Sequence, residues 1–250
     1  MKSFTRSGNY FYIITNSQEI VRLNIITKEI KLKYYTVTIS GITKRHVLHD
    51  NNYLYVSYYD PNGNSGYISR IQLPTPPIIV CFKEGSKILT VEGYKPIETL
   101  KKGDLLQTAK HGLLPIEIIG KREIYHSASQ ERIKDQLYKC SSNEFEEILE
   151  DLVLTGCHSI LVDDFVSETQ KEKTAEVNGK IYVTDGKYRL PACVDERTSV
   201  YETPGSYKIY HLVLENDDYY TNYGIYANGL LVETCSKKNI KDLSDMELIE

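Results

Sequence analysis

Apolar and polar residues alternate through the first 73 positions, and this period of two predicts antiparallel β-strands. Strands are expected over residues 10–14, 19–24, 53–56 and 68–73, with a hairpin turn rich in Asp, Pro, Asn and Gly at 60–64. The segments that begin at Tyr10 and Tyr53 are similar and lie roughly 40–50 residues apart, the spacing of β-propeller blades. The region is therefore either a small antiparallel β-meander or a β-propeller fragment, since two blades cannot close a ring.

Alternation resumes at residue 81, after a proline-rich stretch at 74–77 that favours an extended connection. A short helix is expected over 142–149 and another in the tail, where apolar residues recur every third position. The chain therefore divides into residues 1–77, a domain over 78–235, and a helical tail over 236–250 that packs on this domain. The strands expected after residue 81 are 87–91, 104–108, 116–124, 136–139, 152–154, 159–162, 181–184, 208–214 and 223–226, and the apolar tail residues are Ile240, Leu243, Met246 and Ile249.

Composition supports an all-β fold class and argues against several classes of function. The 250 residues include 21 Tyr and no Trp, together with many β-branched residues, which favours strands. The formal net charge of -4 argues against a nucleic-acid binder, and no apolar run is long enough to cross a membrane. The chain starts without the apolar segment of a secretory signal peptide, and five cysteines do not suggest a disulfide framework. We therefore expect a reducing compartment.

Three segments carry candidate chemistry. Cys81 opens the second domain, Thr155 and His158 lie between two predicted strands, and His211 lies near the end of another. No two cysteines have the Cys-x-x-Cys spacing of zinc sites, so we expect no metal. Nucleophilic catalysis needs a thiol, a proton carrier and an orienting group, and these four residues supply them if the fold brings them together.

Taken together, these segments resemble the Hint fold shared by inteins and the C-terminal domains of hedgehog proteins. Residues 81–108 are similar to the N-terminal block of that family, with a leading cysteine and a P-I-E-x-L-x-x-G-D pattern. Residues 155–158 match its T-x-x-H block, and residues 210–232 are similar to its C-terminal block. The resemblance covers about 81–235 and implies a horseshoe-shaped all-β domain, closest in form to the intein-like domains of large DNA viruses and bacteria.

The resemblance also implies a self-processing enzyme whose substrate is its own backbone. In the family the cysteine attacks the carbonyl that precedes it, which here is the Val80–Cys81 peptide bond. This N-to-S acyl shift converts the amide into a thioester. His158 would protonate the scissile nitrogen, and Thr155 would hold the scissile peptide. We expect no cofactor, no nucleic acid and no membrane as partner.

The C-terminal block departs from the family pattern at two positions. Many inteins have Asp where this chain has His211, and Asp218 stands where the block histidine falls. The two residue types look exchanged. We therefore predict that His211 is the base for the Cys81 thiol and that it is paired with Asp218.

The C-terminal end of the domain departs further from the pattern of splicing inteins. Splicing inteins end in His-Asn before a Cys, Ser or Thr, whereas Glu233 and Thr234 precede Cys235 here. Because threonine has no side-chain amide to cyclise, we predict N-terminal cleavage without efficient splicing. The acyl group would pass to water, to an external thiol, amine or alcohol, or to an internal nucleophile such as Cys235 or Ser236.

Two alternatives remain at this point. The domain could be a catalytically silent structural or interaction module of the same fold, with the N-terminal sheets binding a partner. It could also be an intein that splices through a junction without Asn. The remaining cysteines, Cys140, Cys157 and Cys193, are interpreted as packing residues. A cytoplasmic or virion-associated location is expected.

Overall fold

The computed structural model describes residues 3–7, 10–14, 20–24, 30–35, 43–50, 53–60, 65–72, 80–243 and 246–249. The contacts within the chain divide it into two units, with the boundary between Pro76 and Pro77. In the described parts of the chain, no helix is both long enough and apolar enough to cross a membrane.

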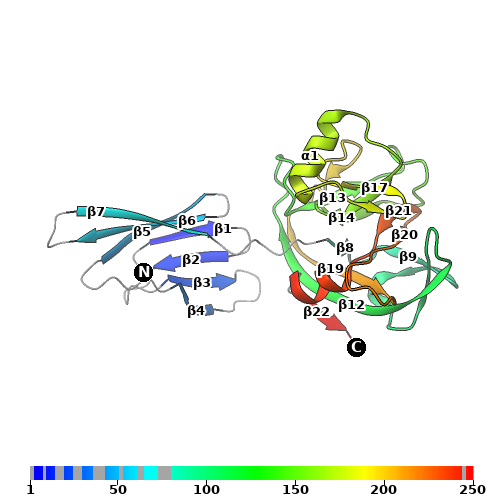
Figure 1. The fold of residues 1–250 in the computed structure, drawn as a ribbon, viewed down its shortest axis with the longest axis horizontal. Helices are drawn as coiled ribbons and strands as arrows, with labels where there is room; N and C mark the ends of the chain where they lie inside the picture. Colours follow the sequence, from blue (N-terminus) through cyan, green and yellow to red (C-terminus); the bar gives the residue numbers. More distant parts are fainter. Residues whose placement is uncertain are drawn as a thin grey trace. The chain divides into compact units, whose positions relative to one another are not determined.

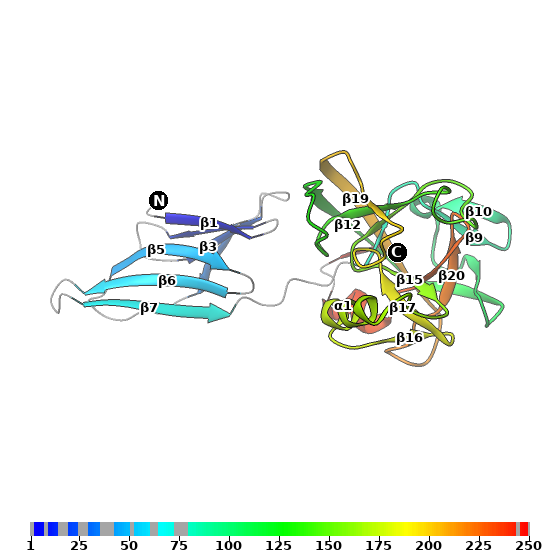
Figure 2. The same ribbon diagram turned by 90° about the horizontal axis from the view of Figure 1, so that it is seen from above.

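The N-terminal unit consists of two antiparallel sheets (Figures 1 and 2), and β5 contacts both β1 and β2 of the first sheet. The four-stranded sheet contains β1 (Ser3–Ser7), β2 (Tyr10–Ile14), β3 (Ile20–Asn24) and β4 (Ile30–Tyr35), and the three-stranded sheet contains β5 (Thr43–Asp50), β6 (Tyr53–Asp60) and β7 (Ser65–Gln72). Tyr10 and Tyr53 begin β2 and β6, each of which lies between two antiparallel neighbours. The repeated sequence therefore falls on equivalent inner strands. Two such sheets form a pair of meanders and do not close a propeller.

Strand alternation explains the packing of these sheets. In β2, Tyr12 and Ile14 are buried and the residues between them are half-buried, and in β6 Leu54 and Val56 follow the same pattern. The hairpin predicted around residues 60–64 is present, because Asp60 pairs with Ser65 across β6 and β7. The turn residues themselves lie outside the described residues.

The C-terminal unit is built on one long open sheet (Figure 1), which confirms the predicted all-β class. Its strand order is β16-β17-β15-β21-β20-β9-β11-β12-β19-β8-β14-β13-β18, with β10 on β9 and β22 on β12. The strands before residue 150 are β8 (Phe82–Lys83), β9 (Lys87–Thr90), β10 (Gly93–Pro96), β11 (Leu105–Gln107), β12 (Leu113–His126) and β13 (Leu137–Cys140), with a 3-10 turn η1 (Ile97–Thr99). The later strands are β14 (Leu152–Thr155), β15 (Ser159–Val162), β16 (Val183–Thr184), β17 (Lys187–Pro191), β18 (Ser199–Val200), β19 (Gly205–Leu214), β20 (Gly224–Ala227), β21 (Leu230–Glu233) and β22 (Glu247–Ile249).

Strands β12 and β19 form the backbone of this unit. They pair antiparallel from Ile116 opposite Leu214 to His126 opposite Gly205, with a β-bulge just after Ile116. All residues from 209 to 214 are buried, so the second half of β19 runs through the interior with both faces covered. This strand therefore places His211 in the core.

A two-residue hairpin sets the position of β21. Asn228 and Gly229 both have positive φ, the backbone that an Asn-Gly turn provides. The Asn228 side chain accepts a hydrogen bond from the Lys87 amide and donates one to the Asp151 carbonyl. A Cβ on Gly229 would lie 2.1 Å from the Glu147 carbonyl oxygen, so only glycine fits there.

One helix prediction was wrong. Residues 142–149 form turns, in which Phe145 and Ile148 are nevertheless buried. The α-helix of this unit is α1 (Glu168–Asn178), capped by the Ser167 hydroxyl, which accepts from the Gln170 amide. The Phe145 segment contributes apolar anchors to the core, but eight residues are too few for a stable helix without further support.

The tail matches its prediction only in part. Among the described residues, 237–243 are helical and include η2 (Asn239–Leu243), whereas Glu247–Ile249 form β22 against β12. Ile240 is buried as expected, and Met246 is half-buried. Strand pairing satisfies backbone groups along residues 119–121 of β12, which favours a strand over a short marginal helix.

Candidate active site

The position of Cys81 is set by the two-residue strand that comes directly after it. Phe82 in β8 pairs with Leu154 of β14 on one side and with Tyr210 of β19 on the other. Strand β14 ends in Thr155, and His211 follows Tyr210 in β19. Three segments far apart in the sequence therefore meet around one buried cysteine, as predicted for a site in which Cys81, Thr155 and His211 come together.

Thr155 holds the backbone of Cys81 from both sides. The Cys81 amide donates a 2.9 Å hydrogen bond to Thr155 Oγ1, and the Thr155 amide donates a 3.0 Å hydrogen bond to the Cys81 carbonyl. The Cys81 nitrogen is also the nitrogen of the Val80–Cys81 peptide bond. The threonine hydroxyl therefore contacts the nitrogen that would leave if this bond were cleaved.

Two buried histidines lie next to each other in this core. The ring centroids of His158 and His211 are 5.1 Å apart, and both rings contact Phe82 edge-on. Neither ring has a hydrogen-bond partner for either nitrogen among the described residues. Buried polar atoms without partners are rare and costly in folded proteins, and they often mark a catalytic role.

The local turn explains how His158 reaches this position. The His158 amide donates to the Thr155 carbonyl at 2.9 Å, closing a tight turn between β14 and β15. The turn directs the imidazole toward the backbone of Cys81 and Glu233, whose proximity raises the pKa of the ring but only partly offsets burial. The T-x-x-H spacing thus places the threonine and the histidine beside the same cysteine.

Burial dominates the electrostatics of the site. It lowers the pKa of His158 to about 3, and together with the neighbouring His158 it lowers the pKa of His211 well below its usual value. Burial also raises the pKa of the Cys81 thiol, and Arg122 opposes this rise only in part. Near neutral pH the thiol and both imidazoles are therefore uncharged. A resting thiolate–imidazolium pair does not form.

Asp218 does not belong to this cluster, so its predicted pairing with His211 was wrong. It is exposed in the loop after β19, where its carboxylate accepts hydrogen bonds from the Tyr220 amide and the Thr221 hydroxyl. These two hydrogen bonds lower the pKa of its carboxyl group. The backbone turns out of the core after Leu214, which carries the side chain into solvent.

Cys235 lies at the far end of the site. It follows β21, is buried, and its amide donates a 3.0 Å hydrogen bond to the Leu212 carbonyl. Burial raises the pKa of its thiol, and the nearby Cys81 adds to the rise. Cys81 therefore lies near enough to Cys235 to affect the ionisation of its thiol. All five cysteines are buried and unbridged.

Glu233 is a site residue that sequence reasoning did not identify. Its carboxylate forms a 3.1 Å ion pair with Arg189 and accepts hydrogen bonds from the Ser159 amide and the Asn222 side chain. Burial raises the pKa of this carboxyl, and Arg189 opposes the rise. The available signal was its position two residues before Cys235, where splicing inteins have histidine.

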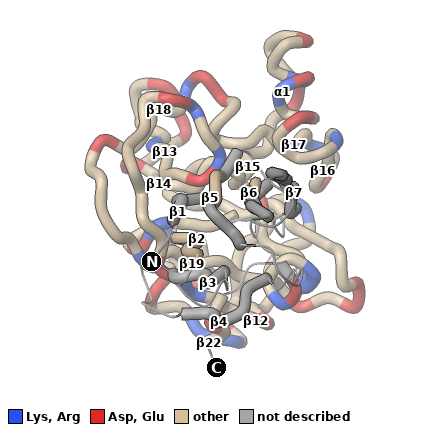
Figure 3. The backbone as a smooth tube through the Cα atoms, turned by 90° about the vertical axis from the view of Figure 1, so that its left-hand side faces the viewer, with Lys and Arg blue, Asp and Glu red and all other residues tan. Residues whose placement is uncertain are grey.

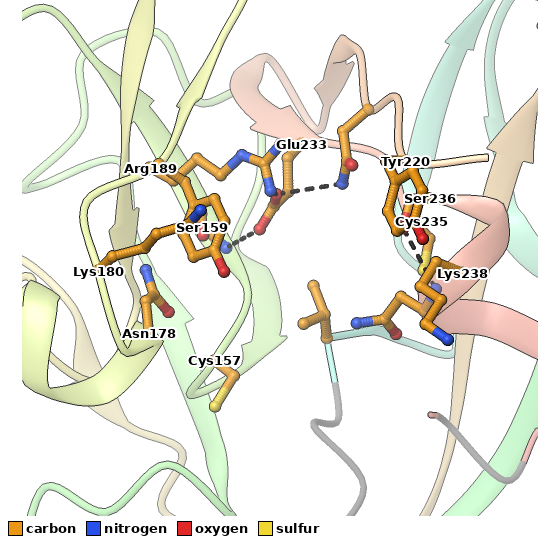
Figure 4. A pocket seen from close by; sticks show the side chains of 14 residues that line it. Cys157, Ser159, Asn178, Lys180, Arg189, Tyr220, Glu233, Cys235, Ser236 and Lys238 are labelled. Atoms are coloured by element: carbon orange, nitrogen blue, oxygen red, sulfur yellow. Dashed lines mark hydrogen bonds and ion pairs between the residues drawn. The ribbon is translucent and has the colours of Figure 1, made fainter. Parts of the chain in front are cut away.

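A cavity of about 480 Å³ adjoins the cluster (Figure 4). Val80, Cys157, Glu233 and Cys235 all line it, so it adjoins the residue that supplies the acyl group of the Val80–Cys81 bond. Among the described residues, no three His, Cys, Asp or Glu side chains are grouped closely enough to hold a metal ion.

Comparison with known proteins adds a family match. A profile described as the Hint domain matches residues 80–239. The gp41-1 intein crystal structure is 15% identical, with 62% of this chain and 98% of that chain covered and a TM-score of 0.33. The solution structure of a bacterial intein-like domain from Clostridium thermocellum is 18% identical, with 63% and 99% covered and a TM-score of 0.34. No curated protein matches the sequence.

Proposed function

Because the chain belongs to the Hint domain family, we propose that its C-terminal unit cleaves its own backbone between Val80 and Cys81. The observation that carries this proposal is the grouping of a buried thiol, a threonine on the scissile nitrogen and two unpartnered imidazoles. Cores built only for stability rarely leave buried imidazole nitrogens without hydrogen bonds, as both nitrogens of His211 are here.

The first step is an N-to-S acyl shift. The Cys81 sulfur forms a bond to the Val80 carbonyl carbon, and the carbon–nitrogen bond of the peptide breaks. The thiol proton moves to an imidazole, for which we assign His211. As His158 gives its N–H proton to the leaving nitrogen, it takes up a proton from the neighbouring His211, so both rings end neutral. Thr155 Oγ1 accepts the N–H of that nitrogen throughout, which keeps it oriented as it becomes an amine.

The proton state of the site constrains how this step occurs. A buried thiol with a raised pKa has a negligible thiolate fraction near neutral pH, so sulfur attack must be coupled to proton transfer. A neutral imidazole can accept that proton directly.

The C-terminal end of the domain supports cleavage without splicing. Thr234 is buried, its carbonyl accepts a 2.6 Å hydrogen bond from the Asn222 side chain, and its own side chain has no amide nitrogen. Cyclisation of this residue, which would release the segment that starts at Cys235, is chemically unavailable. The thioester is then resolved by water or by another nucleophile.

Mass spectrometry of the full chain tests the proposal. The wild type should give fragments 1–80 and 81–250, while Cys81→Ala stays intact. Cys140→Ala is the matched control, because Cys140 is an equally buried thiol elsewhere in the core and its loss should not prevent cleavage. Intact wild type after prolonged incubation with thiol or hydroxylamine would refute the proposal and support a silent module. A ligated product that joins Val80 to Cys235 would refute cleavage without splicing.

A further inference from the structure

The bond-breaking step does not require the cavity next to Val80. Cys81 is only 1% exposed and does not line the cavity, whereas Val80, Cys235 and Ser236 do. An external acceptor must reach the Val80 carbonyl carbon to resolve a thioester. On the proposed function, an acceptor would approach that carbon from solvent through this cavity.

The side chains that line this cavity carry an excess of positive charge. Arg189, Lys180 and Lys238 line it, and Glu233 is its one acidic lining residue among those described. Arg189 and Lys180 lie on one wall, and Lys238 lies on the opposite wall beside Cys235 (Figure 4). Elsewhere the basic and acidic residues are interspersed along the same loops and along α1 (Figure 3), and the whole chain has a net charge of -4.

Existing ion pairs leave one of these cations available. Arg189 pairs with Glu233 at 3.1 Å, and Lys238 pairs with Asp242 at 2.7 Å. Lys180 has no ion-pair partner among the described residues. It follows α1, whose left-handed C-cap Gly179 turns the chain toward the cavity.

One aromatic ring keeps two of the cations together. The Lys180 ammonium lies 4.9 Å and the Arg189 guanidinium 5.4 Å from the centre of the Tyr182 ring. Such cation–π contacts orient a positive group without neutralising it. The wall of the cavity that carries Lys180 therefore presents positive charge.

We propose that this cavity admits the acyl acceptor and selects a small thiol or amine that carries a carboxylate, which the Lys180 ammonium attracts. For a thiol acceptor, its sulfur bonds to the Val80 carbonyl carbon and the carbon–sulfur bond to Cys81 breaks. The acceptor's thiol proton ends on the Cys81 sulfur, so atoms and charge balance. The N-terminal segment then leaves as a thioester of the acceptor, or as an amide when the acceptor is an amine.

A set of thiols that differ in charge tests this selectivity. Full-length protein is treated with mercaptopropionate, mercaptoethanol or mercaptoethylamine, and each cleavage rate is divided by the rate of the same thiol with a free peptide thioester. The normalised rate should be highest for the anion and lowest for the cation. The preference should be roughly three- to tenfold, as for one unit charge about 6 Å away in a partly solvated site, and high salt should reduce it.

Charge reversal provides the decisive comparison. In Lys180→Glu the ratio of anionic to neutral rates should fall below one, whereas the exposed Lys173→Glu on α1 changes the net charge equally and should keep the wild-type ratio. Using a ratio within each variant removes any effect on thioester formation itself. Equal normalised rates for all three thiols, or equal effects of the two substitutions, would overturn the acceptor assignment while cleavage itself stands. Absence of cleavage with every thiol would instead refute the proposed function.

Discussion

Acid should unfold the C-terminal unit through its buried histidines, and His158 allows the size of this effect to be worked out. Its pKa falls from 6.5 to about 3 on burial. Because the folded value lies below the unfolded one, the unfolded chain takes up the proton first as the pH decreases. The stabilisation is complete above pH 6.5 and is lost progressively down to about pH 3.

The size of the His158 pKa shift sets the size of the stability change. At 1.36 kcal/mol for each pKa unit, His158 alone contributes roughly 5 kcal/mol across this range, and roughly 3 kcal/mol of this is lost by about pH 4.5. A domain stability is typically about 5–15 kcal/mol, so this one side chain removes a large part of it. His211 acts in the same direction, while the raised pKa of the Glu233 carboxyl favours the folded state at low pH.

The assay uses the uncleavable Cys81→Ala chain. All cysteines lie in the C-terminal unit and are buried, so their reaction with dithiodipyridine during urea unfolding reports on that unit alone. The free energy of unfolding is measured between about pH 7.5 and about pH 4.5. In the same background, His158→Gln should flatten the pH dependence by roughly 3 kcal/mol. The exposed His46→Gln in the other unit is the matched control and should not flatten it. Equal slopes for His158→Gln and its parent would show that this imidazole does not resist protonation.

Three substitutions test other parts of the structure. Gly229→Ala places a Cβ against the Glu147 carbonyl at positive φ, so thermal unfolding should show a loss of at least about 2 kcal/mol, and an unchanged melting temperature would contradict this geometry. Thr155→Ala should slow cleavage by about a hundredfold, and Thr155→Ser should restore it, as followed by gel; equal rates for both variants would argue against a role for the hydroxyl. Thr234→Asn supplies the missing amide and should produce new cleavage before Cys235, detectable by mass; its absence would mean that the surroundings, not only the residue type, prevent cyclisation.

The sequence indicates much of the site because its blocks are local. The T-x-x-H spacing fixes a turn that places Thr155 and His158 together, and the apolar run in β19 predicts a buried strand around His211. The meeting of these two segments depends on β8, which has two residues and pairs with strands from both. Two residues carry no periodicity, so no pattern in the sequence predicts this strand.

Other failures have equally specific causes. The exchange inferred between His211 and Asp218 compared residue types at aligned positions, but Asp218 lies in a solvent-exposed turn where its carboxylate bonds to the next residues. Helix α1 has no apolar stripe, so periodicity missed it, although Ser167, Gln170 and Gly179 give its start and end signals. For Glu233 the sequence offers only its position before Cys235, because its partners come from β15 and β17 through the fold.

The burial of the Cys81 nitrogen has a consequence for the proposed acyl shift. Strand β8 stays paired with both neighbours, so the newly formed amino terminus remains inside the dry core beside two uncharged rings. An amine there resists protonation and stays nucleophilic, since a buried ammonium is costly. It is held within reach of the thioester it has just left and can re-form the peptide. On the proposed function, the acyl shift therefore reverses unless another nucleophile removes the acyl group from Cys81.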